Sequence, residues 1–241
     1  MPSFLIAGSP AAVAEAVAGR VEGVAAEAVT ARGRWAVALP GGSVAATCFP
    51  RLVTATLDWS RAEVFFGDER AVPPDAPDSN FGLARRLLLS HVPLSDDHVY
   101  RMAAEPASLD AAAAGYARTL ASVLGDPPVL DLVLLGVGED GHVCSVFPGP
   151  PTPHAAEGWV AAVREAPKPP PDRLTLTLAT LVAARHVMVV AMGTAKAAAI
   201  RAALEDAAST LPVARVARAA RDVRFILDAG AASALGHAPS A

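Results

Sequence analysis

The stretch "DLVLLGVGEDGHVCSVFPG", residues 131–149, joins an apolar run typical of a buried strand to a glycine-rich turn. Three glycines of that turn, Gly136, Gly138 and Gly141, form the G-x-G-x-x-G pattern that often marks a dinucleotide site. A dinucleotide site needs a long helix after its last glycine, whereas only six residues follow Gly141 before a proline-rich segment begins. We therefore interpret the turn as a loop that follows a strand and presents His142.

The remainder of the chain alternates short apolar runs with longer alanine-rich segments. The apolar runs predict strands at residues 4–7, 35–39, 63–66, 131–135, 174–178, 186–192 and 223–227. The alanine-rich segments predict helices at residues 10–31, 44–57, 82–90, 108–124 and 194–205. Strands that alternate with helices predict an α/β fold, in which a mostly parallel sheet is covered by helices on both faces.

The composition indicates a large buried core and argues against a nucleic-acid partner. The chain has 241 residues, of which 53% are hydrophobic, and this length suits one large α/β domain or two small ones. Its formal net charge is −4 and its lysines and arginines form no run, whereas a nucleic-acid surface needs a basic stripe. A small anionic ligand is compatible with this charge, because two or three well-placed cations are enough to bind it.

The cysteines and the apolar runs point to a soluble cytoplasmic protein. Cys48 and Cys144 lie far apart in the sequence, which suits a reducing compartment better than a disulfide-bonded scaffold. The N-terminal segment has no basic region, and its apolar run is too short for a signal peptide. No apolar run reaches the length that spans a membrane.

Eight prolines between residues 148 and 171 interrupt the alternation. Proline has no amide hydrogen and a fixed φ, so we expect this segment to be a semi-rigid excursion from the sheet. One interpretation is a plain surface connection. The other, which we favour slightly, is a rim or lid beside a functional site, because the segment follows His142 closely and loops held by a rigid sheet often carry function.

Polar or glycine-rich clusters follow four of the predicted strands. They are "PGGS" at 40–43, "GDER" at 67–70, "GVGEDGH" at 136–142 and "GTAK" at 193–196. Each cluster alone would be an ordinary turn between a strand and a helix. The carboxyl ends of parallel strands meet at one edge of the sheet, and ligands of open α/β sheets bind there. Four clusters together therefore predict a functional site at this edge.

Two of these clusters have the chemistry of an anion site. Gly41, Gly42 and Ser43 stand where a strand passes into a helix, and free amides and the helix dipole attract an anion there. An ordinary glycine turn with Ser43 as the helix cap is an equally good interpretation, and the two are compatible. Lys196, at the start of another helix, opposes the helix dipole unless an anion shares the site. Arg70 adds a cation suited to a carboxylate, a phosphate or an oxyanion.

His142 is the candidate for proton transfer, because histidine titrates near neutral pH. Asp140 stands two residues earlier and could orient the imidazole, although a histidine that merely closes a turn would give the same pattern. A metal site would need a third ligand that this pair lacks. Cys144 lies in a short apolar stretch, so a small buried side chain is favoured over a nucleophile.

Taken together, these segments resemble the 6-phosphogluconolactonases. The opening turn is similar to that family's G-x-G-x-D-G-H-x-x-S-L-F-P-G signature, and "LPGGSVA" is similar to its S-G-G-S-T-P turn. The segment "FFGDERAVPPDAPDSNFG" is similar to its D-E-R-x-V-P…D-S-N segment. Two later segments, "DRLTLTLATLVAARHVMVVAMGTAKAAAI" and "LPVARVARAARDVRFILDAGAA", extend the resemblance over residues 35–232.

Two related classes of protein give alternatives. Glucosamine-6-phosphate deaminases usually carry D-E-Y where this chain has "DER" at 68–70, and A-F-N-E-P where it has "SVFPG" at 145–149, so the lactonase is favoured. A non-catalytic sugar-phosphate sensor is more remote, because the chain has no obvious DNA-binding appendage. The chain departs from the lactonase pattern at Pro40, which replaces a serine, and at 44–45, where Val-Ala replaces Thr-Pro and removes one hydroxyl from the phosphate turn.

The resemblance implies that the chain hydrolyses 6-phospho-D-glucono-1,5-lactone to 6-phosphogluconate in the oxidative pentose phosphate pathway. It implies a single domain, residues 1–241, built as a Rossmann-like three-layer α/β/α sandwich without a metal or organic cofactor. The partner would be a small phosphorylated sugar lactone, and the protein a monomer or weak dimer. His142 would be the base, Asp140 or Asp68 its partner, and Arg70 the group that stabilises the oxyanion. The residues that bind phosphate and substrate would be Gly41, Gly42, Ser43, Arg173, Lys196 and Ser145.

Overall fold

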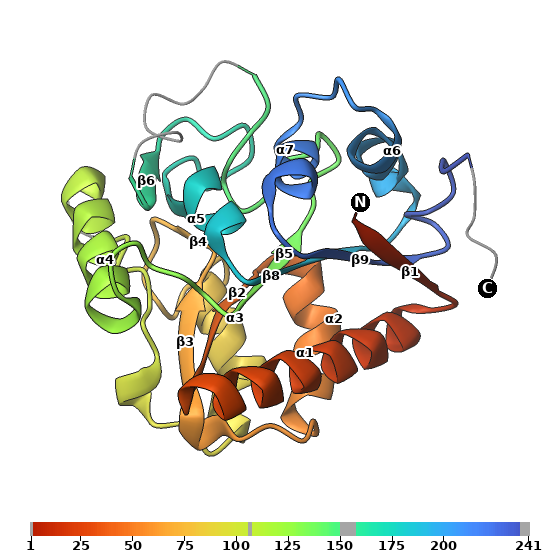
Figure 1. Ribbon diagram of the computed structural model, residues 1–241. Coiled ribbons are helices and arrows are strands. Elements are labelled where there is room, and N and C mark those ends of the chain that lie inside the picture. The colour runs from red at the N-terminus through yellow and green to blue at the C-terminus, as the bar shows by residue number, and fades with distance from the viewer. Residues whose placement is uncertain (1, 106–107, 150–157, 237–241) are drawn as a thin grey trace.

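The computed structural model describes residues 2–105, 108–149 and 158–236 (Figure 1). Its centre is a sheet of six parallel strands in the order β1-β9-β8-β5-β2-β3. These strands are β1 (Ser3–Ala7), β2 (Trp35–Leu39), β3 (Ala62–Phe66), β5 (Leu132–Gly136), β8 (His186–Ala191) and β9 (Val223–Asp228). Six of the seven predicted strands therefore belong to one parallel sheet.

Helices cover both faces of this sheet (Figure 1). One face carries α1 (Pro10–Arg32), α2 (Gly42–Val53) and α3 (Asn80–Leu87). The other face carries α5 (Leu178–Ala183), α6 (Ala197–Glu205) and α7 (Pro212–Ala219). Short 3-10 turns occur at Trp59–Arg61, Leu89–His91, Asp96–His98 and Thr194–Lys196. The predicted three-layer α/β/α architecture with a mostly parallel sheet is confirmed.

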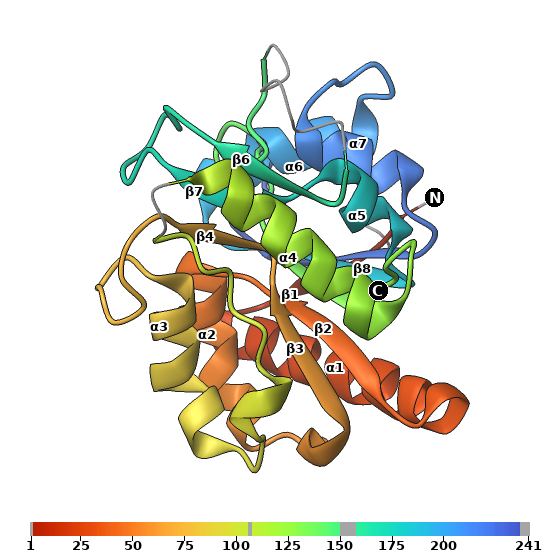
Figure 2. The same cartoon turned by 90° about the vertical axis from the view of Figure 1, so that its left-hand side faces the viewer.

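A second, antiparallel sheet lies above the carboxyl end of β3 (Figure 2). It has the order β4-β7-β6 and packs against α4. Its elements are β4 (Asp68–Arg70), β6 (Val160–Val163), β7 (Arg173–Leu176) and the adjoining α4 (Leu109–Leu124). The predicted strand at 174–178 belongs to this sheet and ends earlier, because the Thr177 hydroxyl accepts the amide of Thr180 and caps α5. An apolar run predicts an extended backbone but does not fix which strand it pairs with.

The proline-rich segment differs in part from the expected excursion. Val160–Val163 within it forms β6 and pairs along its whole length with β7. Residues 150–157, which are the centre of the predicted rim or lid, lie outside the described residues. Of the described part, Val160–Val163 therefore belongs to the small sheet beside the carboxyl edge of the central one, and residues 164–171 lie in the connection from β6 to β7.

The core explains why the central strands read as unbroken apolar runs. Every residue of β2 and β3 is buried, because helices cover both faces of the sheet. Trp35, Phe65 and Phe66 are among the largest fully buried side chains. This packed sheet is the rigid support on which the loops at its two edges are held.

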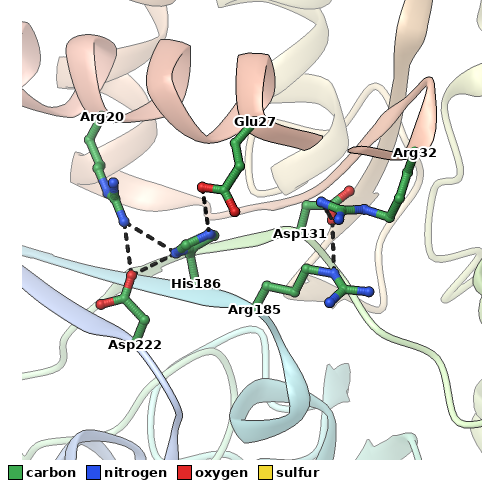
Figure 3. Close-up of polar contacts among 7 residues, drawn as sticks. All are labelled: Arg20, Glu27, Arg32, Asp131, Arg185, His186 and Asp222. Carbon is green, nitrogen blue, oxygen red and sulfur yellow. Dashed lines mark hydrogen bonds and ion pairs between the residues drawn. The ribbon is translucent and has the colours of Figure 1, made fainter. Parts of the chain in front are cut away.

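At the amino ends of the central strands, charged side chains pair with one another (Figure 3). The carboxylate of Asp131, which precedes β5, lies 2.7 Å from Arg32 and 3.3 Å from Arg185. His186, the first residue of β8, lies 2.6 Å from the carboxylate of Asp222. These pairs offset the cost of holding charged groups close to the core.

Candidate active site

The four polar or glycine-rich clusters meet at the carboxyl edge of the central sheet, as predicted. The strands that precede them, β8, β5, β2 and β3, are consecutive neighbours in the sheet, and a cavity of about 160 Å³ lies at their ends. Residues from all four clusters line this cavity, namely Gly41, Gly42, Ser43, Asp68, Arg70, Gly136, His142 and Lys196, together with Asn80 and Arg173.

The imidazole of His142 is held by Asp140. Its Nδ1 lies 2.6 Å from Oδ1 of Asp140, and the same oxygen accepts the backbone N–H of His142 at 3.2 Å. The turn is closed by the amide of Gly138, which donates to the carbonyl of His142 at 2.8 Å. A Cβ on Gly138 would overlap the imidazole and the Asp140 carboxylate. This glycine of the G-x-G-x-x-G pattern therefore makes room for the His142–Asp140 pair.

The contact with Asp140 determines which nitrogen of the neutral ring carries the proton. Burial raises the pKa of Asp140, but the charge of His142 and its hydrogen bonds outweigh burial and hold that pKa below its usual value. Asp140 is therefore ionised near neutral pH and accepts a hydrogen bond from Nδ1–H. In the neutral ring this leaves Nε2 without a proton and free to act as a base. The imidazole also packs against Phe147, with the ring centroids 4.7 Å apart.

The turn between β2 and α2 presents unpaired amides. Gly41 is the N-cap of α2, and no side chain caps the first turn of that helix. Gly42 has a φ of +61°, a left-handed conformation that glycine adopts without strain. Ser43 lies one residue inside the helix, so the interpretation of Ser43 as the cap is wrong. The uncapped amides and the helix dipole give this end of the cavity the character of an anion site.

Lys196 brings a cation to the same cavity. It ends the 3-10 turn Thr194–Lys196, directly before α6, and lines the cavity. Its Nζ lies 3.9 Å from the carboxylate of Glu139, whose side chain is 61% exposed. An ion pair that is this long and this exposed is weak, so the ammonium can exchange Glu139 for an anionic ligand.

Two arginines come from the small antiparallel sheet. Nε of Arg70 is buried and has no hydrogen-bond partner among the described residues. The guanidinium of Arg173 donates to the carbonyls of Pro170 at 3.0 Å and Lys168 at 2.6 Å, and it lies over the ring of Phe147. Burial, followed by the charge of Arg70, lowers the pKa of Arg173. Two cations this close together favour an anionic ligand between or beside them.

Asp68 has partners other than His142. Its Oδ2 accepts the hydroxyl of Ser145 at 2.6 Å, and its Oδ1 accepts the side-chain amide of Asn80 at 3.1 Å. Of the two aspartates considered as the partner of His142, the structure therefore places Asp140 beside the imidazole. Ser145 is fully buried and does not line the cavity, so its hydroxyl supports Asp68 from behind the cavity wall.

Two polar residues at the site were not among the predicted site residues. Asn80 lines the cavity, and the residue before it, Ser79, is the N-cap of α3. Glu69 is buried and accepts the backbone amides of Arg70, Asn80 and Phe81, each at 2.8 Å. Burial raises the pKa of Glu69 above its usual value, because it outweighs these hydrogen bonds, which act in the opposite direction. A composition signal pointed to Asn80, because the sequence contains one asparagine and no glutamine.

A cysteine nucleophile and a metal ion are two other chemistries that the site residues could provide. Cys144 lines the cavity, and burial raises the pKa of its thiol well above the usual value. A protonated thiol is a poor nucleophile, so this pKa does not favour a nucleophilic role. The side chain is only half-buried, because it lines the cavity, whereas the sequence predicted a buried one. In the parts of the chain that the structure describes, no group of three or more His, Cys, Asp or Glu side chains could hold a metal ion.

Comparison with known proteins identifies the family of this chain. Residues 8–225 match the family of glucosamine-6-phosphate isomerases and 6-phosphogluconolactonases. The chain belongs to this family. Among its relatives is the 6-phosphogluconolactonase of Rattus norvegicus, which is 43% identical over 212 residues, or 85% of this chain and 82% of the relative.

Solved structures of the family share the fold. The 6-phosphogluconolactonase of Trypanosoma cruzi superposes with a TM-score of 0.87 at 30% identity, covering 98% of each chain. A monomeric glucosamine-6-phosphate deaminase has a TM-score of 0.82 but only 21% identity, covering 96% of this chain and 99% of that one. At that identity the deaminase shares the fold alone. Within the described residues, no helix has the length and apolar character required to cross a membrane.

Proposed function

We propose that this family member hydrolyses 6-phospho-D-glucono-1,5-lactone to 6-phosphogluconate. The observation that carries the proposal is the His142–Asp140 pair, which stands beside an anion-binding turn in one cavity. The pair can move a proton, and the turn can hold the phosphate of a sugar phosphate. The relatives named 6-phosphogluconolactonase support the same reaction.

His142 acts as the general base in the proposed reaction. Nε2 takes a proton from a water molecule as the water oxygen forms a bond to C1 of the lactone. The C1–ring-oxygen bond then breaks, and the imidazolium returns the proton to the ring oxygen, which becomes a hydroxyl. Asp140 keeps Nδ1–H in place and stabilises the imidazolium while it exists. General-base help of this kind contributes roughly 10²–10⁴-fold to the rate.

The cations and the backbone amides bind the phosphate and stabilise the oxyanion in the proposed reaction. The amides of Gly42 and Ser43 and the ammonium of Lys196 bind the phosphate and thereby position the ring. Arg70, whose Nε has no partner among the described residues, stabilises the oxyanion that develops at C1. Arg173 adds a second positive charge to the cavity wall. Asp68 and Ser145 hold the wall together through their hydrogen bond.

The proposal extends to the domain organisation, compartment, oligomeric state and partner of the protein. We infer that residues 1–241 act as one catalytic domain in the cytoplasm, as a monomer or weak dimer. A small phosphorylated sugar lactone is its partner, and the steps above need no nucleic acid. The acidic net charge of −4 supports the last point, because the sequence contains no run of lysines and arginines.

The test is a paired assay on the purified protein. Freshly generated 6-phosphogluconolactone is added while acid release is followed, and glucosamine 6-phosphate is added in parallel while ammonia is followed. His142→Ala is the control in both assays. Fast lactone hydrolysis that the variant loses, without ammonia, is the expected result. Ammonia release would identify the protein as a deaminase instead. Binding of a sugar phosphate without product in either assay would identify it as a sensor.

A further inference from the structure

Asn80 is the only side-chain carboxamide in the sequence, which has one asparagine and no glutamine. It is the first residue of α3, is 2% exposed and lines the cavity. A carboxamide offers two N–H donors and one acceptor oxygen, and burying it is costly unless these groups are used. A single buried carboxamide at the site is therefore expected to have a specific task.

The orientation of the carboxamide is fixed by Asp68. Nδ2 of Asn80 donates to Oδ1 of Asp68 at 3.1 Å and to its backbone carbonyl at 3.0 Å. Both partners are acceptors, so the nitrogen must face Asp68 and the oxygen must point away from it. The other carboxylate oxygen of Asp68 accepts the hydroxyl of Ser145 at 2.6 Å. Asn80 thus supplies two of the donors that hold Asp68 in the cavity wall.

The oxygen of the carboxamide lies against the anion-binding turn. A Cβ on Gly41 would overlap Oδ1 of Asn80, so only glycine allows the turn and this side chain to come so close. Gly41 is also the N-cap of α2, whose first amides are uncapped. Asn80 therefore lies between the turn that binds an anion and the carboxylate beside it, and contacts both.

We propose that Asn80 is a positioning residue that couples the turn at Gly41 and Gly42 to Asp68. The inference rests on the proposed function, in which that turn holds the substrate phosphate. Because Asn80 packs on the turn and binds Asp68 rigidly, it sets the distance from the bound phosphate to the wall that carries Arg70. A phosphate held at another distance would place C1 out of line with His142, so the loss of Asn80 lowers kcat as well as raising KM.

The uniqueness of Asn80 gives a direct readout in solution. In a ¹⁵N-labelled sample only Asn80 can give an asparagine or glutamine side-chain NH₂ pair, and its loss in Asn80→Asp assigns it. We expect two well-separated proton signals that exchange slowly with solvent and shift saturably when 6-phosphogluconate or inorganic phosphate is added. Glucose, which has no phosphate, should leave them unchanged. An NH₂ pair that stays in place while backbone amides of the turn shift would overturn the coupling.

Asn80→Asp tests the coupling in the enzyme, because it keeps the shape and replaces the donor by a carboxylate oxygen. Two carboxylates in contact share one proton at lower pH, and the shared O–H then replaces the lost N–H donor. We expect kcat/KM to fall about tenfold to a hundredfold at pH 8 and the gap to the wild type to narrow towards pH 6. Glu69, Arg70 and Arg173 are the other charged groups beside this position and are present in both proteins, so the pH dependence is taken from the ratio of the two kcat/KM values.

Ser79→Ala is the matched control. It removes the hydroxyl that caps the same end of α3, which accepts the amide of Gly82 at 3.0 Å and donates to Glu69 at 3.0 Å, and it leaves the contacts of Asn80 with Asp68 and Gly41 in place. It should lower Tm while kcat/KM stays within about twofold at every pH. An equal loss of activity in this variant, or wild-type kcat/KM in Asn80→Asp at every pH, would make Asn80 merely structural. If the wild type fails to hydrolyse the lactone, the proposed function falls, and the NH₂ response to phosphate still decides the role of Asn80.

Discussion

Two histidine–aspartate pairs lie at opposite edges of the same central sheet. In each pair Nδ1 of the histidine is 2.6 Å from a carboxylate oxygen, in His142–Asp140 at the carboxyl edge and in His186–Asp222 at the amino edge (Figure 3). The two histidine side chains are almost equally exposed, at 17% and 18%. They differ at the other ring nitrogen, because Nε2 of His186 faces Glu27 at 3.6 Å whereas His142 lines the cavity.

The difference lies in what surrounds each pair. At the amino edge Arg20 donates to Asp222 at 2.8 Å, and Arg185, whose buried Nε makes no hydrogen bond among the described residues, lies 3.3 Å from the carboxylate of Asp131 (Figure 3). At the carboxyl edge, uncapped amides of α2 and the unpaired Nε of Arg70 adjoin the cavity in the described structure. A histidine–aspartate pair is therefore not in itself evidence of catalysis. Donors without partners that line the same cavity as the imidazole are the feature that indicates a reaction.

Replacing each histidine by alanine is expected to give the largest difference in kcat between the two pairs. His142→Ala is expected to lower kcat by roughly 10²–10⁴-fold with little change in KM or Tm, because it removes the proposed base. His186→Ala is expected to keep the wild-type kcat and to lower Tm, because it removes only pairing at the far edge. Lactone hydrolysis followed by acid release, together with thermal melts, measures both. Equal losses of kcat in the two variants would remove the distinction.

Asp131 tests whether the amino edge serves stability. Its carboxylate is 7% exposed, pairs with Arg32 and Arg185, and accepts the amide of Ala36 at 2.9 Å. Asp131→Ala leaves all three groups without that acceptor, so the free energy of unfolding should fall by about 2–4 kcal/mol. Urea titration measures this loss, and kcat at 25 °C should stay near the wild-type value. Asp131→Asn, which keeps an acceptor for Ala36, should lose less; an equal loss would point to the charge alone.

Lys196 tests the claim that the carboxyl edge holds a phosphate. Lys196→Ala should raise KM for the lactone about tenfold to a hundredfold with a smaller effect on kcat, because a charge-assisted contact to the phosphate is lost. Steady-state kinetics at two salt concentrations measures the change, which added salt should reduce. Glu139→Gln is the matched control, since it removes the partner of Lys196 but no phosphate contact. A KM that rose equally in Glu139→Gln would point to the ion pair instead.

The sequence predicted the parallel sheet and the edge that carries the site, and the physical reason is local. Apolar runs such as "WAVAL" and "DLVLL" are buried on both faces, so each identifies a central strand without its neighbours. Gly, Asp and Lys clusters at the ends of four such parallel strands lie at the same edge of the sheet, and they meet in one cavity because β8, β5, β2 and β3 are neighbours. His142 and Asp140 stand two residues apart, so one short turn was enough to bring them together.

What the sequence missed depends on contacts between distant segments. β4 is the charged triplet "DER", which has no strand-like pattern and is extended only because it pairs with β7 more than a hundred residues later. Asn80 lies at the site because it donates a hydrogen bond to Asp68. Ser145 lies outside the cavity lining and donates to the same carboxylate. Local pattern identifies which residues are polar at an edge, but their partners follow from the tertiary packing.

The smallest expected effect concerns acid and Asp222. Burial raises the pKa of Asp222, but the hydrogen bond from His186 and the charges of His186 and Arg20 together hold it below its usual value. A carboxyl group whose pKa is lowered by folding stabilises the fold above its unfolded pKa of about 4, and this contribution is lost as pH falls through the lower, folded value. Asp222→Asn should therefore lower Tm by about 1–3 °C near pH 6, since the side chain is 43% exposed and the pair is screened.

The pH profile of that difference distinguishes pairing from mere packing. Melts of wild type and Asp222→Asn should converge as the pH falls below about 4, because the wild-type carboxyl is then protonated and resembles the amide. Asp75→Asn, at an exposed loop position, serves as the control and should show no such convergence. A Tm difference that stayed constant down to pH 3 would mean that the amide fails for steric reasons. Steric packing, rather than the pairing of Asp222 with His186 and Arg20, would then stabilise the amino edge.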